Sequence, residues 1–188
     1  MRPFIVLAAF LAFPLLASDT YQIDPAHSEI SFRVQHLGLS KVFGRFTNYQ
    51  GAILLDDQDL SRSKVDVSIE AYSVNTESDA RDKHLRSADF FDVARFPNVT
   101  FHSVSVKPAG KDRFDVTGDF TLHGVTRRLT LPMAATGTAR TPKETRVGFE
   151  GTVTLNRSDY GMTYMPGIVG DGVAVTLGIE AVKAEAKP

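Results

Sequence analysis

The sequence contains no cysteine and no tryptophan, and it has no long apolar run beyond its first 17 positions. Without cysteine, neither a disulfide framework nor a thiolate metal site can form, so stability must come from the packed core. No block of five or six like charges occurs, and 21 basic residues nearly balance 22 acidic ones. Because a nucleic-acid-binding domain usually shows a basic stripe, the sequence indicates no nucleic-acid partner.

The first 18 residues have the pattern of a secretory signal peptide. Arg2 gives a positive start, residues 4–16 are apolar apart from one proline, and the small residue Ala17 precedes polar residues. Thirteen apolar residues are too few to span a bilayer, which takes about 20. We therefore expect residues 1–18 to be cleaved and residues 19–188 to form one exported domain without a transmembrane anchor.

The rest of the chain is dominated by alternation of polar and apolar residues. This period of two is typical of antiparallel strands that bury one face. The phase slips near Ser103, as a β-bulge would produce. The segments with regular or nearly regular alternation are residues 29–35, 41–56, 64–71, 99–107, 114–122, 127–139, 147–155 and 173–181.

These segments predict an all-β fold of about eight strands. Eight antiparallel strands can close into a barrel without exposed edges, and the long segment 127–139 indicates an elongated barrel. Residues 78–93 alone carry apolar side chains at helical spacing, which predicts one short helical segment. A two-sheet sandwich with a solid core is the alternative that periodicity leaves open.

Residue types that usually carry catalysis or bind metals are scattered along the chain. None of the five histidines lies within four residues of another, whereas zinc sites usually show closely spaced ligand pairs. No G-x-S-x-G nucleophile motif is present. The sequence is instead rich in apolar bulk, with 13 Phe, 5 Tyr and 4 Met, which can pack a core or line a site for an apolar ligand. We therefore expect no metal site and no catalytic residue.

Four ordered motifs resemble the YceI-like family of secreted, polyisoprenoid-binding, lipocalin-like proteins, and the similarity covers nearly the whole mature chain. The motifs are YQIDPAHSEISFRVQHLGLSKVFGRF (residues 21–46), DKHLRSADFFDVARFPNVTF (82–101), FTLHGVTRRLTLP (120–132) and LNRSDYGM (155–162).

This resemblance implies a periplasmic, often dimeric, lipocalin-like barrel of eight strands, from a family whose members are commonly associated with stress. Its tunnel is expected to hold an isoprenoid or other long-chain lipid (a quinone tail, a polyprenyl derivative or a fatty amide), with no cofactor required. We therefore expect a binding protein and not an enzyme. One alternative is an enzyme that acts on the tunnel-bound lipid through His27, His36 or Asp89. Another is an interaction protein whose own side chains fill the barrel.

Alternation and the positions of bulky residues predict the ligand site. The head group or tunnel mouth is expected at Arg157, Asp159, Tyr160, Met162 and Tyr164. The tunnel lining is expected to comprise Phe32, Val34, His36, Phe46, Val67, Ile69, Leu85, Phe90, Phe91, Phe101, Phe120, Leu122, Met133, Phe149, Val175 and Leu177.

Overall fold

The computed structural model describes residues 18–184, and β-sheet dominates this part of the chain. The predicted signal peptide, apart from Ser18, lies outside the described residues. In chain order the elements are β1 (Asp19–Ile23), β2 (Glu29–His36), β3 (Ser40–Phe46), β4 (Tyr49–Leu55), η1 (Leu60–Arg62), β5 (Lys64–Glu70), η2 (Ala71–Ser73), β6 (Val74–Asn75), α1 (Asp79–Leu85), β7 (Asn98–Gly110), β8 (Arg113–Leu122), β9 (Val125–Arg140), β10 (Thr145–Asn156), η3 (Arg157–Tyr160) and β11 (Val169–Lys183).

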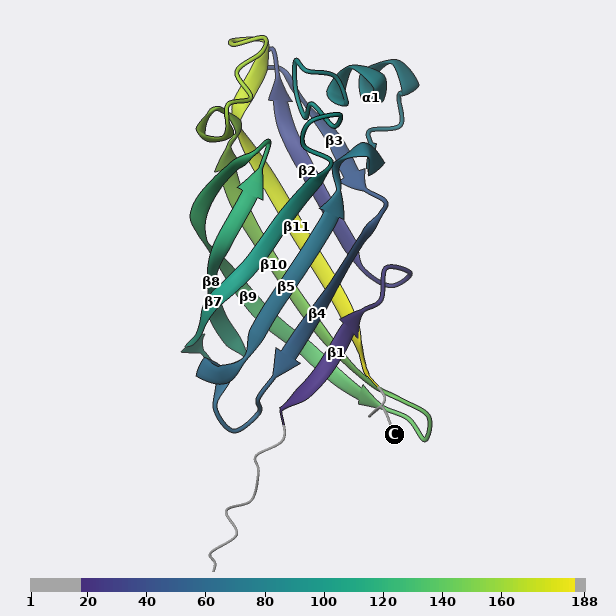
Figure 1. Cartoon of the computed structure of the whole chain (residues 1–188), viewed down its shortest axis with the longest axis vertical. Helices are drawn as coiled ribbons and strands as arrows, with labels where there is room; N and C mark the ends of the chain where they lie inside the picture. The colour runs from purple at the N-terminus through teal and green to yellow at the C-terminus, as the bar shows by residue number, and fades with distance from the viewer. Residues whose placement is uncertain (1–17, 185–188) are drawn as a thin grey trace, which may run out of the picture.

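Eight of these strands form a closed antiparallel ring. Each strand pairs with the next in the order β1, β4, β5, β7, β8, β9, β10 and β11, and β11 pairs back with β1. In Figure 1 the strands run obliquely around a long axis, with α1 at the upper end and the β9–β10 hairpin at the lower end. The predicted elongated barrel of eight antiparallel strands is therefore confirmed, with three strands added to it.

The added strands exist because β11 pairs with two strands in succession. Its last part, residues 181–183, pairs with β1, whereas residues 169–178 pair with β2. A turn at residues 24–28 moves the chain from β1 to β2 along this shared partner. β3 then pairs with β2, and the two-residue β6 pairs with β3. The sheet therefore extends beyond the ring near the α1 end.

The helix is shorter than the sequence predicts. Helical spacing indicated a helix over residues 78–93, but α1 ends at Leu85 and the rest of the segment forms turns. The hydroxyl of Ser87 donates to a carbonyl of the last helical turn, which favours the end of the helix there. The turns bring Phe90 and Phe91 to the barrel interior, so their apolar character reflects this contact and not a helical face. No helix among residues 18–184 is long and apolar enough to cross a membrane.

The irregularity in the alternation of β7 corresponds to a bulge. The register between β7 and β8 shifts between Ser103 and Ser105, which confirms the bulge predicted near Ser103. The extra residue, Val104, is 55% exposed, whereas Val106 is again buried in the core. The bulge therefore shifts the alternation by one residue, so that Val106 points inward although it lies an odd number of residues after the buried Phe101.

Candidate ligand-binding cavity

Side chains that point into the barrel enclose a cavity of about 620 Å³. This volume lies within the range of about 300–1,000 Å³ that small-molecule sites occupy. All eight ring strands contribute side chains, because alternate residues of a barrel strand point inward. Between its two ends the lining consists of aliphatic and aromatic residues with no charged group. The barrel therefore does not have the solid core of the sandwich alternative.

All of the predicted lining residues except His36 line this cavity. They are Phe32, Val34, Phe46, Val67, Ile69, Leu85, Phe90, Phe91, Phe101, Phe120, Leu122, Met133, Phe149, Val175 and Leu177. That these residues contact a ligand stays a prediction.

His36 was expected in the lining from the inward phase of β2, but it does not line the cavity. It belongs to the same phase of β2 as Phe32 and Val34, but it is the last residue of the strand. At that position β2 pairs with Ser40, which is the first residue of β3 after the turn that joins the two strands. Phase alone gives the direction of a side chain but does not show where along the strand the cavity ends.

The structure adds lining residues that sequence reasoning left out. Leu129 and Leu131 share the inward phase of Met133 along β9, so the alternation already carried the signal for them. Ile23 and Ile53 lie on β1 and β4, which are short strands with a less regular pattern. For these two residues the sequence offered only local hydrophobicity.

Aromatic rings give the cavity wall its shape. In the half near α1, the ring of Phe46 lies 5.8 Å from that of Phe32 and 5.7 Å from that of Phe91, centroid to centroid. In the opposite half, Phe114 and Phe149 meet edge to face at 5.8 Å. These tilted and edge-on contacts are the favoured geometry for aromatic pairs, so the rings are held in place on the wall.

Buried side chains close the cavity at the α1 end. Phe90 and Met162 line it there and are 8% and 7% exposed. Arg157, the first residue of η3, lies in the same lining and is 6% exposed. Its guanidinium donates to three backbone carbonyls: from Nε to Gly170 at 3.0 Å, from Nη1 to Met162 at 2.7 Å and from Nη2 to Val169 at 3.1 Å. These bonds hold the segment 162–170 across the barrel end.

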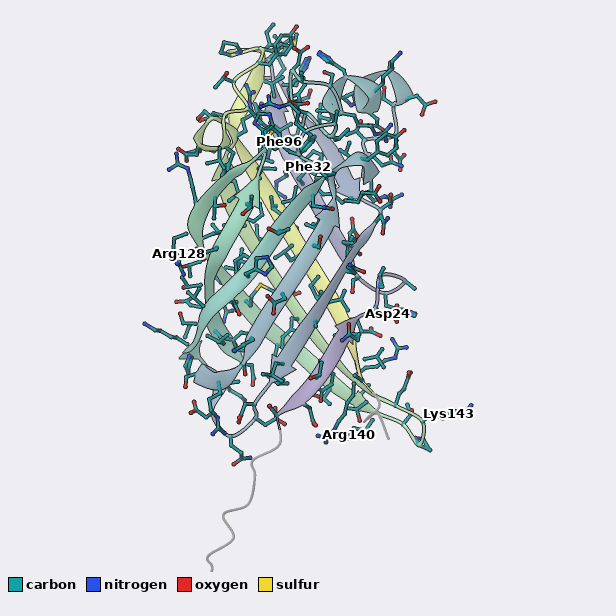
Figure 2. The ribbon with its side chains drawn as sticks, in the orientation of Figure 1. Asp24, Phe32, Phe96, Arg128, Arg140 and Lys143 are labelled. Carbon is teal, nitrogen blue, oxygen red and sulfur yellow. The ribbon has the colours of Figure 1, made fainter. Side chains whose placement is uncertain are left out.

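At the opposite end the lining is polar and exposed. Asp57 follows β4, Asp112 lies in the β7–β8 turn and residues 136–138 belong to β9, and all of them are exposed. Figure 2 labels Arg140 and Lys143 near the β9–β10 hairpin, at the end of the barrel away from α1. The cavity therefore opens to solvent at this end.

Two of the residues predicted at the head group or mouth face away from the cavity. The carboxylate of Asp159 lies 3.8 Å from the guanidinium of Arg127 on the surface. Tyr160 is buried behind the wall, where its ring meets that of Phe120 edge-on at 5.5 Å. Burial raises the pKa of the Tyr160 hydroxyl, which therefore stays neutral at physiological pH.

Tyr164, the third such residue, covers the closed end from outside. Its side chain is partly exposed and does not line the cavity. The ring packs edge-on against Phe90 at 5.5 Å and against His84 at 5.4 Å. These contacts join the loop after η3 to the α1 segment, so the predicted mouth is the covered end of the barrel.

The residues of the enzyme alternative are not brought together at the cavity. None of His27, His36 and Asp89 lines it. His27 lies outside the barrel, where Nδ1 is 2.9 Å from a carboxylate oxygen of Asp24. Asp89 pairs with His84 at 2.8 Å in the α1 segment. Among the described residues, the geometry therefore offers this alternative no shared site.

An ion-pair cluster on the outer wall joins the β1–β2 turn, β10 and β11. Asp24, His27 and Glu180 form the one group of described residues with metal-ligand spacing, their ligand atoms lying within 4.8 Å. The guanidinium of Arg146 binds Asp24 at 2.7 Å, and it also binds Glu180 and Glu144. Hydrogen bonds from Arg146 and then His27 lower the pKa of Asp24 to about 2. The bound guanidinium indicates a structural role for this cluster, which lies on the lower half of the barrel in Figure 2.

The sequence comparison agrees with this architecture. The YceI-like domain model matches residues 21–181. The chain belongs to the YceI-like family. A UPF0312 protein of Pseudomonas paraeruginosa is 40% identical over 179 residues, which is 94% of this chain and 93% of the relative. Protein YceI of Salmonella arizonae is 40% identical over 166 residues, covering 87% of this chain and 86% of that protein.

Solved structures of similar fold include three bacterial proteins. Burkholderia cenocepacia BcnA has a TM-score of 0.76 at 22% identity, over 84% of this YceI-like chain and 98% of its own. The Campylobacter jejuni YCEI protein has a TM-score of 0.73 at 29% identity, over 80% and 90%. A domain of Saccharophagus degradans that is described as polyisoprenoid-binding has a TM-score of 0.69 at 18% identity, over 87% and 98%. The first and third show the fold alone.

Proposed function

We propose that this YceI-like protein is an exported binding protein that encloses a long apolar lipid and is not an enzyme. The proposed ligand is of isoprenoid type, such as a quinone tail or a polyprenyl derivative, or a fatty amide. The observation that carries the proposal is the apolar cavity, which runs from the α1 end to the solvent-exposed end. By enclosing a lipid, the protein would carry it, store it or protect it under stress.

The dimensions of the cavity fit a single chain. Lining residues of β10 extend from Leu155 to Val147, which is eight steps of about 3.3 Å, or roughly 20 Å along the axis of a tilted strand. A methylene group takes up about the volume of a water molecule, roughly 30 Å³. The 620 Å³ cavity therefore holds about 20 carbon groups.

Burial of such a chain can supply the binding energy without a catalytic group. Each enclosed methylene contributes about 0.8 kcal/mol, so 20 of them contribute roughly 16 kcal/mol. Association and ordering of the chain oppose this by an estimated 4–15 kcal/mol. The surplus is large enough for retention only if most of the chain is enclosed, which favours a ligand as long as the cavity.

The family relationship supports the ligand class and the N-terminal pattern supports the location. The Saccharophagus degradans domain of the same fold is described as polyisoprenoid-binding. Residues 1–18 have the composition of a cleaved signal peptide, so we place the mature protein in the periplasm. A homodimer is the proposed assembly, as expected from the family.

The test is to purify the untagged protein from the periplasmic fraction of its native host. Intact mass should show a chain that begins near Asp19, and mass spectrometry of an organic extract should show one lipid class at near-stoichiometric amount. The lipid must co-elute with the protein and be enriched relative to a total lipid extract of the same cells. A cytoplasmic chain starting at Met1, or a protein free of lipid, would refute the proposal.

A further inference from the structure

Arg157 differs from the other arginines in both burial and partners. It is the one arginine among residues 18–184 that is buried, and it lies in the lining of the cavity. No carboxylate of the described residues forms an ion pair with it. By contrast, six arginines on the outer surface or at its edge pair with acidic side chains: Arg45, Arg62, Arg95, Arg127, Arg128 and Arg146.

The three hydrogen bonds of Arg157 leave part of its binding capacity free. A guanidinium has five N–H donors, and one donor on each Nη remains after the bonds to Gly170, Met162 and Val169. Backbone carbonyls carry no net charge. The neighbouring Asp171 has its pKa lowered by hydrogen bonds from Ser158 and also by the charge of Arg157, but its carboxylate binds Ser158 and forms no ion pair with the guanidinium. The positive charge is therefore oriented without a direct anionic partner. Because the surroundings are apolar, the attraction of this charge for an anion is stronger than it would be in water.

We propose that Arg157 is the head-group site of the cavity and that it selects lipids with an anionic, oxygen-rich polar end, such as a phosphate or a carboxylate. The ligand then lies with its head beneath α1 and its tail toward the solvent-exposed end. This inference rests on the proposed function and adds to it the class of head group and the direction of the chain.

The charged residues that line the cavity at its other end favour the same direction, whereas Arg140 and Lys143 lie near that end without lining the cavity. Asp57 and Asp112 line the cavity there, and their carboxylates would repel an anionic head. A tail longer than the cavity can leave through this end. An anionic head at the α1 end satisfies the free donors of Arg157, and a planar guanidinium can bind a phosphate or carboxylate through two parallel hydrogen bonds.

The experiment compares three probes with one C20 chain: geranylgeranyl phosphate, geranylgeraniol and geranylgeranylamine. Each is offered at neutral pH to delipidated full-length mature protein, and native mass spectrometry counts the probe retained. Wild type should prefer the phosphate to the alcohol by roughly 10- to 100-fold, the size of a charge-assisted hydrogen bond, and should retain the amine least.

The variants separate head-group binding from the role of Arg157 in holding residues 162–170. In Arg157→Met the phosphate-to-alcohol ratio should fall to about one, and Arg157→Lys should restore part of it. The ratio is measured within each variant, so a smaller folded fraction affects both probes equally. The control is Arg128→Met. Arg128 lies on the outer wall of the barrel (Figure 2), where its guanidinium is 3.0 Å from the carboxylate of Asp119. This variant should keep the wild-type ratio.

A second measurement tests the direction of the chain. A C20 phosphate with a photoreactive diazirine at the tail should label residues of the solvent-exposed end, such as Phe114, and not Met162. Equal retention of all three probes by wild type, a preference that persists in Arg157→Met, or tail labelling at Met162 would overturn the head-group assignment alone. Retention of no probe would overturn the enclosed-lipid function and this inference with it.

Discussion

A bulky side chain at the midpoint of the cavity should shorten the lipid that the protein can hold. Leu177 lines the cavity on β11, opposite Gly151 of β10. Gly151 lies midway between Leu155 and Val147, which line the two halves of the cavity along that strand. Leu177→Trp therefore places an indole in the middle of the path of an enclosed chain.

The size of the effect follows from the volume of the cavity. At about 0.8 kcal/mol per methylene, affinity should rise roughly fourfold with each carbon until the chain is fully enclosed. For wild type the rise should end near 20 carbons, the number that the volume holds. In Leu177→Trp it should end near 10, so that a C16 chain loses about six enclosed groups and up to about 5 kcal/mol.

The assay is a series of straight-chain fatty acids from C8 to C22, with dissociation constants measured on delipidated protein. The control is Thr176→Trp, since Thr176 is the outward neighbour of Leu177 and is exposed. Overpacking usually costs 1–3 kcal/mol, which a domain stable by 5–15 kcal/mol tolerates, and thermal melts of both variants check this. A plateau at the same chain length in wild type and Leu177→Trp would show that the chain does not pass this point.

Two further predictions concern the barrel itself. Because Arg146 lowers the pKa of Asp24 to about 2 from the ordinary 3.8, this carboxylate stabilises the fold above pH 4 and loses its contribution as the pH falls from about 4 to 2. Asp24→Asn should be less stable than wild type at neutral pH by roughly 1 kcal/mol, allowing for solvent screening, and the difference in denaturant midpoint should vanish near pH 2. Gly118→Ala should lower stability by about 1–3 kcal/mol, because the new Cβ would lie 2.5 Å from the ring of Phe101, and a melting temperature equal to that of wild type would contradict this steric clash.

Alternation was sufficient to predict an antiparallel all-β fold and most of the inner wall, whereas the choice of a barrel over a sandwich depended on the family resemblance. On β9, for example, Leu129, Leu131 and Met133 follow one phase and all line the cavity. The physical reason is that a barrel strand has only two directions for its side chains, and one of them is buried. A bulge reverses the phase, and the irregularity near Ser103 was visible in the sequence for the same reason.

Closure of the ring could not be predicted in detail from the sequence. β1 has five residues and directly follows the predicted cleavage site, so its alternation is too short to distinguish it from a loop. Its role depends on pairing with β4 and with the last part of β11, contacts far away in the chain. β6 has two residues and carries no periodicity at all.

The ends of the cavity were the weakest part of the sequence prediction. The segment from Arg157 to Tyr164 was expected at a head group or mouth, and Arg157 does line the cavity, but at its covered end. Asp57 and Asp112, which line the solvent-exposed end, were not selected because acidic residues in turns are ordinary surface features. Which loop covers which end depends on how the strands are arranged around the barrel, and local patterns do not report this.

The pairing of β1 with the end of β11 has a consequence for when the cavity first exists. The ring closes through contacts such as Tyr21 with Lys183, so the closing contact joins the two ends of nearly the whole described chain. Contacts between such distant residues form slowly, because the entropy of a long loop must be lost before they stabilise anything. Residues 181–183 are the last part of the barrel to emerge during synthesis and during the proposed export, so a chain still in transit lacks the strand segment that completes the wall. We therefore expect lipid to be loaded only after export is complete, either into the closed barrel or as a chain around which β1 and β11 finally meet.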